Sequence, residues 1–535
     1  MRRQHIITAI VLLGAMAGSL GLRAQQWTIE LDNARPKTIY QCIAVDGGEA
    51  MLAVGASKLH DQQGNIVDAT GYLLKAWADG TTLTREVDAD GNRMYLCSAT
   101  QLDDGNYMAF GYYSDSLTGT DRLFRNLRVL VLDSDLRTVA QRDYRLDSGG
   151  FVGIVPTGFQ TLRCAKAADG NVVLVTSPWC FEPDISGGSY MRRFRFYELT
   201  PDGDTVRTAV QPRYVGNMPQ EGYYTTNIVP NPLTGGFTFF AKGNYKLTNP
   251  HYTDYGSYGV WNLSRDLEIT YKHPVYFGSY PLYDDPSGIS CEGHWYEGGL
   301  LLTSLFKTKS IDDNTHEGWL YMIDTLGGKH ACVQLPPTDS VTVCEWTGCG
   351  TAYVNDSTIF AVTCSSKPYI YSYPKHANVT IVDKDLNILG RKVLKGDSVD
   401  FDPPCTPVAL NDGSVIIPCP YVLAATQEDH ILLCCFRRDD IEITWDVVQD
   451  NNVQSVGIAF PNPASETLNI PLANAGTGST RLRITDMTGA VFADAPVNVA
   501  GNLLSVDIAS LEPGVYAYQI VTDGTAVAGG KFVKK

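Results

Sequence analysis

The sequence predicts an all-β protein, a seven-bladed β-propeller of four-stranded blades followed by a small β-sandwich. Three observations predict this fold class. Two series of Gly- and Asp-rich turns recur along the chain, short runs that alternate apolar and polar residues stand between them, and the composition changes near Ser455. The predicted divisions are a signal peptide over 1–24, a propeller-like domain over 25–448, a linker over 449–457 and a β-sandwich over 458–535.

The overall composition excludes several classes of protein. Of the 535 residues, 44% are hydrophobic, 10% are aromatic and 19% are charged, which is enough apolar material for a large core and excludes a disordered chain. The formal net charge is −16. A chain this acidic offers no general attraction for phosphate backbones, so we expect no nucleic-acid partner.

The first residues have the pattern of a secretory signal peptide. Arg2 and Arg3 precede an apolar run over 6–20, and Ala24 offers a small residue before the expected mature start at Gln25. The alternative is a membrane anchor, but the run is short for a span of about 20 residues. No later stretch approaches about 18 continuous apolar residues, so we expect no transmembrane segment in the mature chain.

The first series of turns marks hairpins at regular spacing. A Gly or Asp turn is followed each time by a strand-like run, and Gly supplies the positive φ that a tight hairpin needs. Successive markers are 56 to 66 residues apart. The markers are Gly48, Gly105, Gly170, Gly236, Gly299, Ser357 and Gly413.

A second series of turns runs in parallel with the first. Its markers are 54 to 68 residues apart, and the two spacings lengthen and shorten together. The markers are Gly80, Asp135, Gly203, Asp266, Gly327, Asp385 and Asp439. Two hairpins in each period give four strands, which is the unit of a β-propeller blade.

Some features of the ring stay open at this level. A pair of stacked β-sandwiches is the competing architecture, and six or eight blades are alternatives to seven. The period exceeds the roughly 40–50 residues of common blade repeats, so we assign the excess to insertions such as 114–122, 182–190 and 250–258. A propeller closes with a strand from one terminus, and the candidate is Trp27–Leu31.

The 13 cysteines are expected to form few disulfides despite export. Six of them fall on one strand face at equivalent repeat positions, where they are read as small apolar packing residues. These are Cys42, Cys97, Cys164, Cys291, Cys349 and Cys405. Equivalent positions on different blades are usually too far apart for a disulfide. The pairs to test are Cys344 with Cys349, and Cys419 with Cys434 or Cys435.

The last part of the chain reads as short strands between turns, which indicates a small antiparallel sandwich, and an adhesive Ig-like module is the alternative. A distinctive set of residues runs through it. These are Pro461, Asn462, Pro463, Gly489, Pro513, Gly514, Tyr516, Gly530, Lys531, Phe532, Lys534 and Lys535.

In order, spacing and position these residues resemble the type A C-terminal sorting domain of type IX secretion substrates of Bacteroidota. The resemblance covers about the last 75–80 residues. It implies passage through the inner membrane, recognition by the type IX machinery at the outer membrane, and removal of this domain. It also implies that the cargo is secreted or attached to lipopolysaccharide at the cell surface.

No motif identifies catalytic residues, and we expect neither a metal site nor a cofactor. The chain has no His-Glu-x-x-His motif and no paired Cys-x-x-Cys set. Aromatic-rich insertions are the candidate binding surface, because such side chains stack on sugars or anchor a protein partner. They include Tyr252, Tyr255, Tyr283, Trp295, Tyr369 and Tyr371. Packing within the blades is the alternative role.

These observations favour a non-enzymatic binding or scaffolding protein with an unidentified glycan or protein ligand. The alternative is a secreted propeller hydrolase or lyase that acts on glycans or peptides. Carboxylates, or a carboxylate and a histidine, that converge within about 10 Å at the centre of the ring would favour the enzyme.

Overall fold

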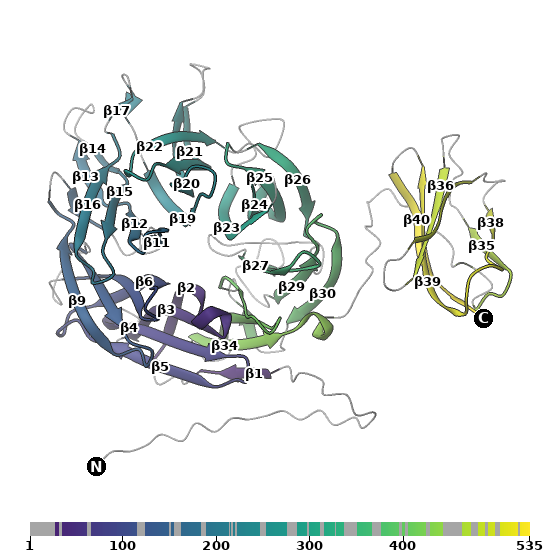
Figure 1. Ribbon diagram of the computed structural model, residues 1–535, viewed down its shortest axis with the longest axis horizontal. Coiled ribbons are helices and arrows are strands. Elements are labelled where there is room, and N and C mark those ends of the chain that lie inside the picture. Colours follow the sequence, from purple (N-terminus) through teal and green to yellow (C-terminus); the bar gives the residue numbers. More distant parts are fainter. Residues whose placement is uncertain are drawn as a thin grey trace, which may run out of the picture. The chain divides into compact units, whose positions relative to one another are not determined.

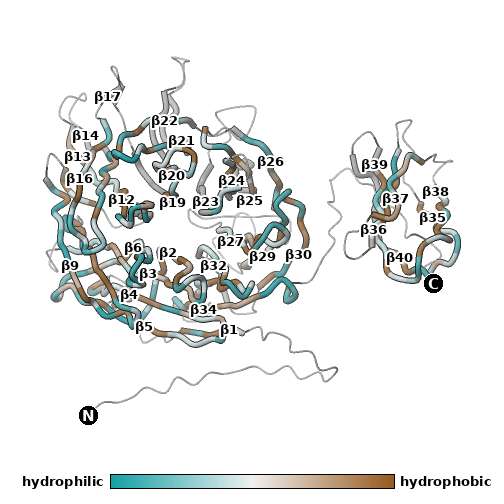
Figure 2. The backbone as a smooth tube through the Cα atoms, in the orientation of Figure 1, coloured by the Kyte–Doolittle hydropathy of each residue, from teal (hydrophilic) through white to brown (hydrophobic). Residues whose placement is uncertain are grey.

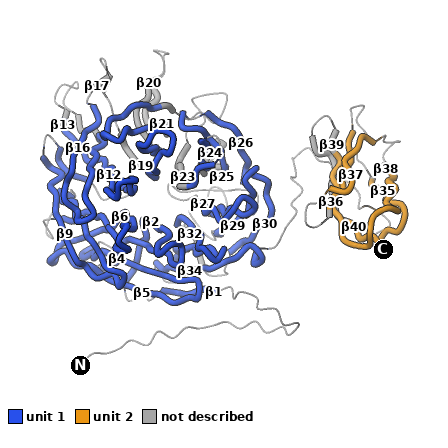
Figure 3. Tube along the Cα trace, viewed as in Figure 1, with its two compact units in different colours: residues 1–443 blue, residues 444–535 orange. Residues whose placement is uncertain are grey.

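The computed structural model describes two compact units, residues 1–443 and 444–535, which are coloured separately in Figure 3. The described residues are 27–31, 35–60, 66–114, 124–148, 151–154, 162–182, 189–212, 214–215, 218–219, 222–246, 253–274, 286–296, 299–310, 315–326, 328–335, 350–365, 376–394, 399–401, 405–423, 429–441, 459, 463–471, 480–486, 491–497, 503–522 and 525–535. Both units consist of antiparallel β-sheets, and within the described residues the first unit also contains two short 3₁₀ turns.

The first unit is a ring of sheets that follow one another in chain order, as Figure 1 shows. The first sheet comprises β2 (Lys37–Val45), β3 (Ala50–His60), β4 (Ile66–Trp77) and β5 (Thr82–Val87), with the 3₁₀ turn η1 (Asp46–Gly48) inside its first hairpin. The second comprises β6 (Met94–Gln101), β7 (Tyr107–Tyr113), β8 (Asn126–Leu132) and β9 (Thr138–Arg145). The third comprises β11 (Arg163–Lys166), β12 (Val172–Thr176), β15 (Arg195–Leu199) and β16 (Thr205–Val210).

The remaining sheets repeat this pattern. The fourth comprises β19 (Gly222–Pro230), β20 (Phe237–Lys246), β21 (Thr253–Leu263) and β22 (Ile269–Pro274). The fifth comprises β23 (Pro286–Tyr296), β24 (Leu300–Ser310), β25 (Thr315–Asp324) and β26 (Lys329–Gln334). The sixth comprises β27 (Gly350–Asn355), β28 (Thr358–Ser365), β29 (His376–Val382) and β30 (Ile388–Leu394). In each sheet the first strand lies towards the middle of the ring and the fourth lies at its rim (Figure 1).

The seventh sheet is completed from the other end of the chain. It comprises β31 (Val399–Phe401), β32 (Val408–Ala409), β33 (Val415–Leu423) and β34 (Asp429–Phe436), and it is followed by the 3₁₀ turn η3 (Arg438–Asp440). Its outer strand is β1 (Trp27–Glu30), which pairs with β34 in the register Trp27 opposite Cys435. The prediction that Trp27–Leu31 supplies the closing strand is therefore confirmed. The inner edge is split, because β31 and β32 pair with opposite ends of β33.

Both predicted turn series coincide with the hairpins. Markers of the first series stand between the first and second strands of each sheet, and Gly105 has φ +89° there. Markers of the second series stand between the third and fourth strands, as Asp135 does. The carboxylate of Asp133 caps that turn, because its Oδ1 accepts hydrogen bonds from the backbone N–H groups of Asp135 (2.9 Å) and Arg137 (2.8 Å). Gly327 lies outside the described residues. Asp439 differs because it lies in η3, since the fourth strand of that sheet comes from β1.

Each sheet buries its faces against its neighbours. The middle strands are buried on both sides, as β8 and β12 are throughout, whereas the fourth strand β9 alternates exposed and half-buried positions. Between the third and fourth sheets, Trp261 stacks on Phe239 at 5.8 Å and Phe196 meets Phe239 edge-on. Figure 2 shows how hydrophobic and hydrophilic residues are distributed over these strands. An apolar cluster lies between each pair of adjacent sheets, including the first and last, so the ring is propeller-like.

Two small sheets stand outside the repeat. One comprises β10 (Phe151–Gly153), β13 (Trp179–Glu182) and β14 (Ser189–Arg192), and the other comprises β17 (Tyr214–Val215) and β18 (Met218–Pro219). The strands β13 and β14 flank the predicted insertion 182–190 and form an arm between the second and third strands of the third sheet. The insertion therefore carries secondary structure of its own.

The second unit contains one pair of strands and one four-stranded sheet around a common core. The pair is β35 (Thr467–Pro471) with β38 (Leu503–Asp507). The sheet has the order β37 (Val491–Pro496), β36 (Thr480–Asp486), β39 (Gly514–Thr522) and β40 (Thr525–Lys534). Leu468 and Leu504 from the pair pack against Ile484 and Ile520 from the sheet, which gives two layers.

The closing strand gives a test of the ring. Trp27 packs against the core between the last and first sheets, and its Nε1 donates to the carbonyl oxygen of Ala78 at 2.6 Å. We expect Trp27→Ala to lower the free energy of unfolding by about 2 kcal/mol, below the value for a fully buried aromatic because Trp27 is only half-buried. Urea unfolding of the mature chain measures this. The control is Val139→Ala on the outer strand β9, where the side chain is 56% exposed, and equal losses for both variants would contradict the closing role of β1.

Candidate functional site

A cavity lies where the inner strands of the ring converge. Its volume is about 570 Å³, and its wall is formed by β2, β6, β11, β19, β27 and the residues around β32. These are first strands of their sheets, so the wall is built from equivalent positions of the repeat. Backbone, small aliphatic, thiol, amide and hydroxyl groups form most of the described surface, and its charged side chains are Arg163 and Lys166. We call this space the central cavity.

Arg163 joins three inner strands at the cavity wall. Its Nη1 donates to the carbonyl oxygens of Leu162 at 2.8 Å and Cys97 at 3.3 Å, and its Nη2 donates to that of Tyr40 at 3.4 Å. The residue is 9% exposed, and burial lowers the pKa of its guanidinium from the ordinary value. A guanidinium stays charged even when its pKa is lowered, so Arg163 brings a positive charge to the wall.

Amide and hydroxyl groups hold the same three strands together. Gln41 on β2 accepts hydrogen bonds at Oε1 from the Ser98 hydroxyl at 2.7 Å and from the backbone of Ala99 at 2.8 Å. The backbone N–H of Cys164 donates to the Ser98 hydroxyl at 3.1 Å. This side of the cavity is therefore fixed by polar contacts between different sheets, which favours a preformed site.

The thiols of the inner strands are poor nucleophiles, although only some of them line the cavity. Burial raises the pKa of Cys97 and of Cys164 to about 12 in each case. At neutral pH both groups are therefore protonated, and a protonated thiol is a poor nucleophile. Their environment matches the predicted packing role, which also holds for Cys42, whereas Cys405 is half-buried. Cys291 lies on β23 with its side chain outside the described atoms, and Cys349 lies outside the described residues.

An aromatic group stands at the edge of the cavity between the fifth and sixth sheets. The His294 ring stacks on Tyr353 at 3.6 Å, and Tyr296 meets both rings edge-on. The Tyr353 hydroxyl donates to Asp356 at 2.7 Å. Burial lowers the pKa of His294, with Asp356 opposing this effect, so the ring is neutral at pH 7.

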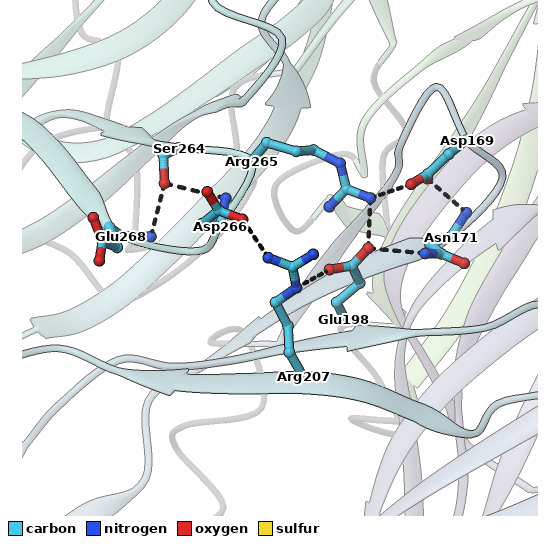
Figure 4. Close-up of polar contacts among 8 residues, drawn as sticks. All are labelled: Asp169, Asn171, Glu198, Arg207, Ser264, Arg265, Asp266 and Glu268. Atoms are coloured by element: carbon cyan, nitrogen blue, oxygen red, sulfur yellow. Dashed lines mark hydrogen bonds and ion pairs between the residues drawn. The ribbon is translucent and has the colours of Figure 1, made fainter.

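Ion pairs link neighbouring sheets around the ring, and one with a deeply buried carboxylate centres on Glu198. Figure 4 shows that its carboxylate accepts from Asn171 at 2.8 Å, and it pairs with Arg265 at 2.5 Å and with Arg207 at 2.7 Å. Arg265 also pairs with Asp169, and Glu198 is 1% exposed. The two arginines and two carboxylates tie the third sheet to the hairpin turn of the fourth. This arrangement satisfies a buried charge and stabilises the seam between the sheets.

The pKa of Glu198 shows that its partners outweigh its burial. Burial alone would raise the pKa of this carboxyl, but the hydrogen bonds from Arg265 and Asn171 and the charges of Arg265 and Arg207 lower it below the ordinary value. A second cluster has the same character. Asp46 accepts from Tyr107 at 2.6 Å and pairs at 2.5 Å with Lys75, which is 4% exposed.

The structure places few of the predicted binding aromatics. Tyr252, Tyr283, Tyr369 and Tyr371 lie outside the described residues, and Tyr255 is described only as backbone of β21. Trp295 lies on β23, where its Nε1 donates to the carbonyl oxygen of Pro230 at 2.7 Å and its ring packs against the core between the fourth and fifth sheets. The sequence reasoning missed Arg163 and Glu198. The available signal was a charged residue next to apolar residues in a short strand-like run, which each of these strands contains twice.

The predicted disulfide of Cys419 with Cys434 or Cys435 is wrong. In the pairing of β33 with β34, Cys419 stands opposite Leu432, whereas Cys434 stands opposite Ile417 and Cys435 opposite Ile416. The register therefore offsets the two strands so that no pair of these cysteines is directly opposed. Cys344 and Cys349 lie outside the described residues.

The residues of the C-terminal pattern meet on two adjacent strands. Gly514 is opposite Lys534, and Tyr516 is opposite Phe532, whose ring lies 5.6 Å from that of Tyr516. The Tyr516 hydroxyl donates to the carbonyl oxygen of Glu512 at 2.9 Å, which fixes the turn around Pro513. Gly530 and Lys531 belong to β40, Pro463 is exposed and Lys535 ends the chain. Pro461, Asn462 and Gly489 lie outside the described residues.

The described part of the chain contains neither a membrane-spanning helix nor a metal-binding cluster of side chains. No helix there is long and apolar enough to cross a membrane. No group of three or more His, Cys, Asp or Glu side chains there is arranged to hold a metal ion.

Residues 458–535 match the family described as the secretion system C-terminal sorting domain. The match confirms the resemblance seen in the C-terminal residues. This domain implies interaction with the type IX secretion machinery and delivery to the cell surface or the medium. No curated protein matches the chain.

Several solved structures resemble the chain at low identity. One is a protein of unknown function from Dyadobacter fermentans, with 12% identity, 65% of this chain and 94% of that chain covered, and a TM-score of 0.41. Another is the NanB sialidase of Streptococcus pneumoniae, with 10% identity and a TM-score of 0.42. The likeness covers 78% of this chain and 71% of the sialidase chain. A mutant of the Synechocystis apocarotenoid oxygenase has 12% identity and a TM-score of 0.38. The likeness covers 77% of this chain and 90% of the oxygenase chain. Such distant likenesses carry no inference about activity.

The Glu198 cluster gives a stability test. Glu198→Gln leaves the charges of Arg207 and Arg265 facing a neutral amide, and we expect a loss of about 2–3 kcal/mol in the free energy of unfolding. This lies at the low end for broken buried pairs, because both arginines are partly exposed. Chemical denaturation measures the loss. The matched control is Glu49→Gln at the exposed turn before β3, and a similar loss in both variants would contradict the role of the cluster.

The same cluster predicts a dependence on pH. A carboxyl whose pKa is lowered in the folded state stabilises the fold above its unfolded pKa of about 4.3, and this contribution is lost as the pH falls through the folded pKa. We therefore expect the difference in unfolding free energy between the native protein and Glu198→Gln to be constant from about pH 7 to pH 5. It shrinks below about pH 4. Thermal or urea unfolding over this range measures it, and a difference that grows on acidification would disprove the assignment.

Proposed function

We propose that this protein is a secreted or surface-attached binding protein that has no enzymatic activity, and that its ring is a seven-bladed β-propeller. In this proposal residues 1–24 are a signal peptide, 25–448 form the cargo, 449–457 form a linker and 458–535 direct type IX export. Lipopolysaccharide is the proposed surface partner after the sorting domain is removed. The match of residues 458–535 to the sorting domain supports the export route.

The central cavity is the observation that carries the binding proposal. A volume of about 570 Å³ is within the range of small-ligand sites, and the wall is rigid because each inner strand belongs to a sheet packed on both sides. The described wall contains Arg163 and Lys166 among backbone, amide, hydroxyl and thiol groups. Such groups hold a ligand by hydrogen bonds and charge.

The ligand that fits this wall is a small molecule with negative charge and hydroxyl groups, such as an acidic sugar unit. Arg163 supplies a positive charge, while Thr351 and Asn227 line the same space with hydroxyl and amide groups. The charge of Lys166 is balanced by Asp103 at 2.5 Å. We place recognition of the anionic group on Arg163, because its guanidinium is held at the wall by hydrogen bonds to the backbone of three inner strands.

Aromatic residues of the connecting segments form the second part of the proposal. Stacking on sugar rings would add affinity for an extended glycan. The proposed residues are Tyr252, Tyr255, Tyr283, Trp295, Tyr369 and Tyr371. Trp295 already has a packing role, so it is the weakest member of the set.

The experiment uses the mature chain, residues 25–535, on an array of neutral and acidic glycans and on a panel of peptide and glycan substrates. We expect binding of acidic glycans and no turnover. Arg163→Lys keeps the charge but loses the planar set of donors, and we expect it to weaken binding at least about tenfold. The measurement is isothermal titration calorimetry with the best array ligand.

Two controls make the outcome specific. Arg137→Gln removes a positive charge from an exposed hairpin turn outside the cavity, and it should leave the affinity unchanged. A melting curve for each variant shows that the fold is intact. Release of product from any glycan or peptide would overturn the non-enzymatic proposal in favour of a hydrolase or lyase. Binding that Arg163→Lys does not weaken would move the site away from the cavity.

A further inference from the structure

Two cysteine thiols from opposite ends of the cargo meet where the ring closes. Cys42 lies on β2 of the first sheet, and Cys405 lies just before β32 of the last sheet. Cys42 and Cys405 belong to the same apolar cluster at this seam, and interaction with the Cys405 thiol together with burial raises the pKa of Cys42. Cys405 Sγ also lies 3.8 Å from the carbonyl oxygen of Ile39, a residue 366 positions earlier in the chain. This contact is the exception to the expectation that cysteines on different sheets are too far apart to bond.

Each thiol is held by its own sheet. Cys42 stands opposite Ala53 in the pairing of β2 with β3. The backbone N–H of Cys405 donates to the carbonyl oxygen of Pro418 at 2.9 Å, which attaches it to β33. Both side chains belong to the apolar cluster between the last and first sheets. The two sulfur atoms therefore meet across the seam because two separate backbones place them there.

The other contacts across this seam are short and non-covalent. The chain itself passes from the last sheet to the first between β1 and β2, and β1 is held in the last sheet by four residue pairs with β34. The hairpin turns of the two sheets share the hydrogen bond from the backbone of Asn411 to that of Gly48, at 2.8 Å. A disulfide at this position would add a covalent link between the first and last sheets and would restrict the unfolded chain over most of the cargo.

We propose that Cys42 and Cys405 are joined by a disulfide in the exported protein and that this bond latches the first sheet to the last. Two S–H bonds break and one S–S bond forms. The two electrons and two protons pass to a thiol–disulfide oxidoreductase of the oxidising compartment, whose own disulfide becomes a dithiol. Cys405 is half-buried and attacks this oxidant first, and Cys42 then displaces the oxidoreductase from the mixed disulfide.

Two other cysteines of the inner strands, Cys97 and Cys164, serve as internal controls. Cys97 Sγ lies 3.3 Å from the carbonyl oxygen of Tyr95, and Cys164 contacts Ser98. These contacts are with a carbonyl oxygen and a hydroxyl, and both thiols are buried. These two residues should remain thiols while Cys42 and Cys405 are oxidised.

The test uses the full mature chain produced with export through an oxidising compartment. Thiols are alkylated under denaturing conditions without reductant, and the digested protein is analysed by mass spectrometry. We expect a linked peptide pair that contains Cys42 and Cys405, together with alkylated Cys97 and Cys164. Alkylation of Cys42 or Cys405 in the exported protein, or linkage of either to another cysteine, would overturn the proposal.

A stability measurement separates the latch from a general effect of cysteine loss. Reductant should lower the melting midpoint of the native protein by on the order of 5 °C. The variant Cys405→Ser should melt with the reduced protein and should no longer respond to reductant. The control Cys419→Ser should keep the full response, since Cys419 lies in the neighbouring seam. An unchanged response in Cys405→Ser would rule out this bond as the latch.

Discussion

Burial of both faces of every four-stranded sheet is the constraint on which the rest of this structure depends. A twisted sheet with apolar residues on both sides needs a neighbour on each side, and a row of such sheets leaves two open faces unless it closes. Here the last apolar cluster lies between the seventh and first sheets and includes Met51, Leu74, Ile416 and Leu433. The central cavity, the inter-sheet ion pairs and the seam between Cys42 and Cys405 all follow from that closure.

Hairpin turns could be read from the sequence because their causes are local. A Gly with positive φ, or an Asp that accepts from the backbone two residues on, leaves the same trace in the sequence wherever it occurs. Two such series predicted the order of strands and the closing strand at Trp27. The closing strand was predictable because a closed ring needs a strand from one end of the chain to complete its last sheet, and the strand-like run at Trp27 is in the right place to supply it.

Pairings between distant residues could not be read in the same way. Arg163, Glu198 and the contact of Cys42 with Cys405 each depend on how sheets rotate and pack around the ring, and turn spacing holds no information on that. Phasing placed Cys42 and Cys405 on equivalent strand faces. It could not show that the split inner edge of the last sheet brings Cys405 against β2. The wrong pairing of Cys419 arose from the same gap, because adjacency in a hairpin does not fix register.

The position of the charged groups connects closure to recognition. Carboxylates such as Glu198 and Asp46 lie at seams between sheets and are engaged by Arg or Lys, so their charge is used to hold the ring. Arg163 also joins three inner strands, because its guanidinium donates to the backbone carbonyl oxygens of Leu162, Cys97 and Tyr40. A positive group fixed by three sheets keeps its position without a ligand, so an anion that enters the cavity meets a preorganised partner. Any change that loosens the ring would therefore weaken binding at the cavity even where it touches no ligand.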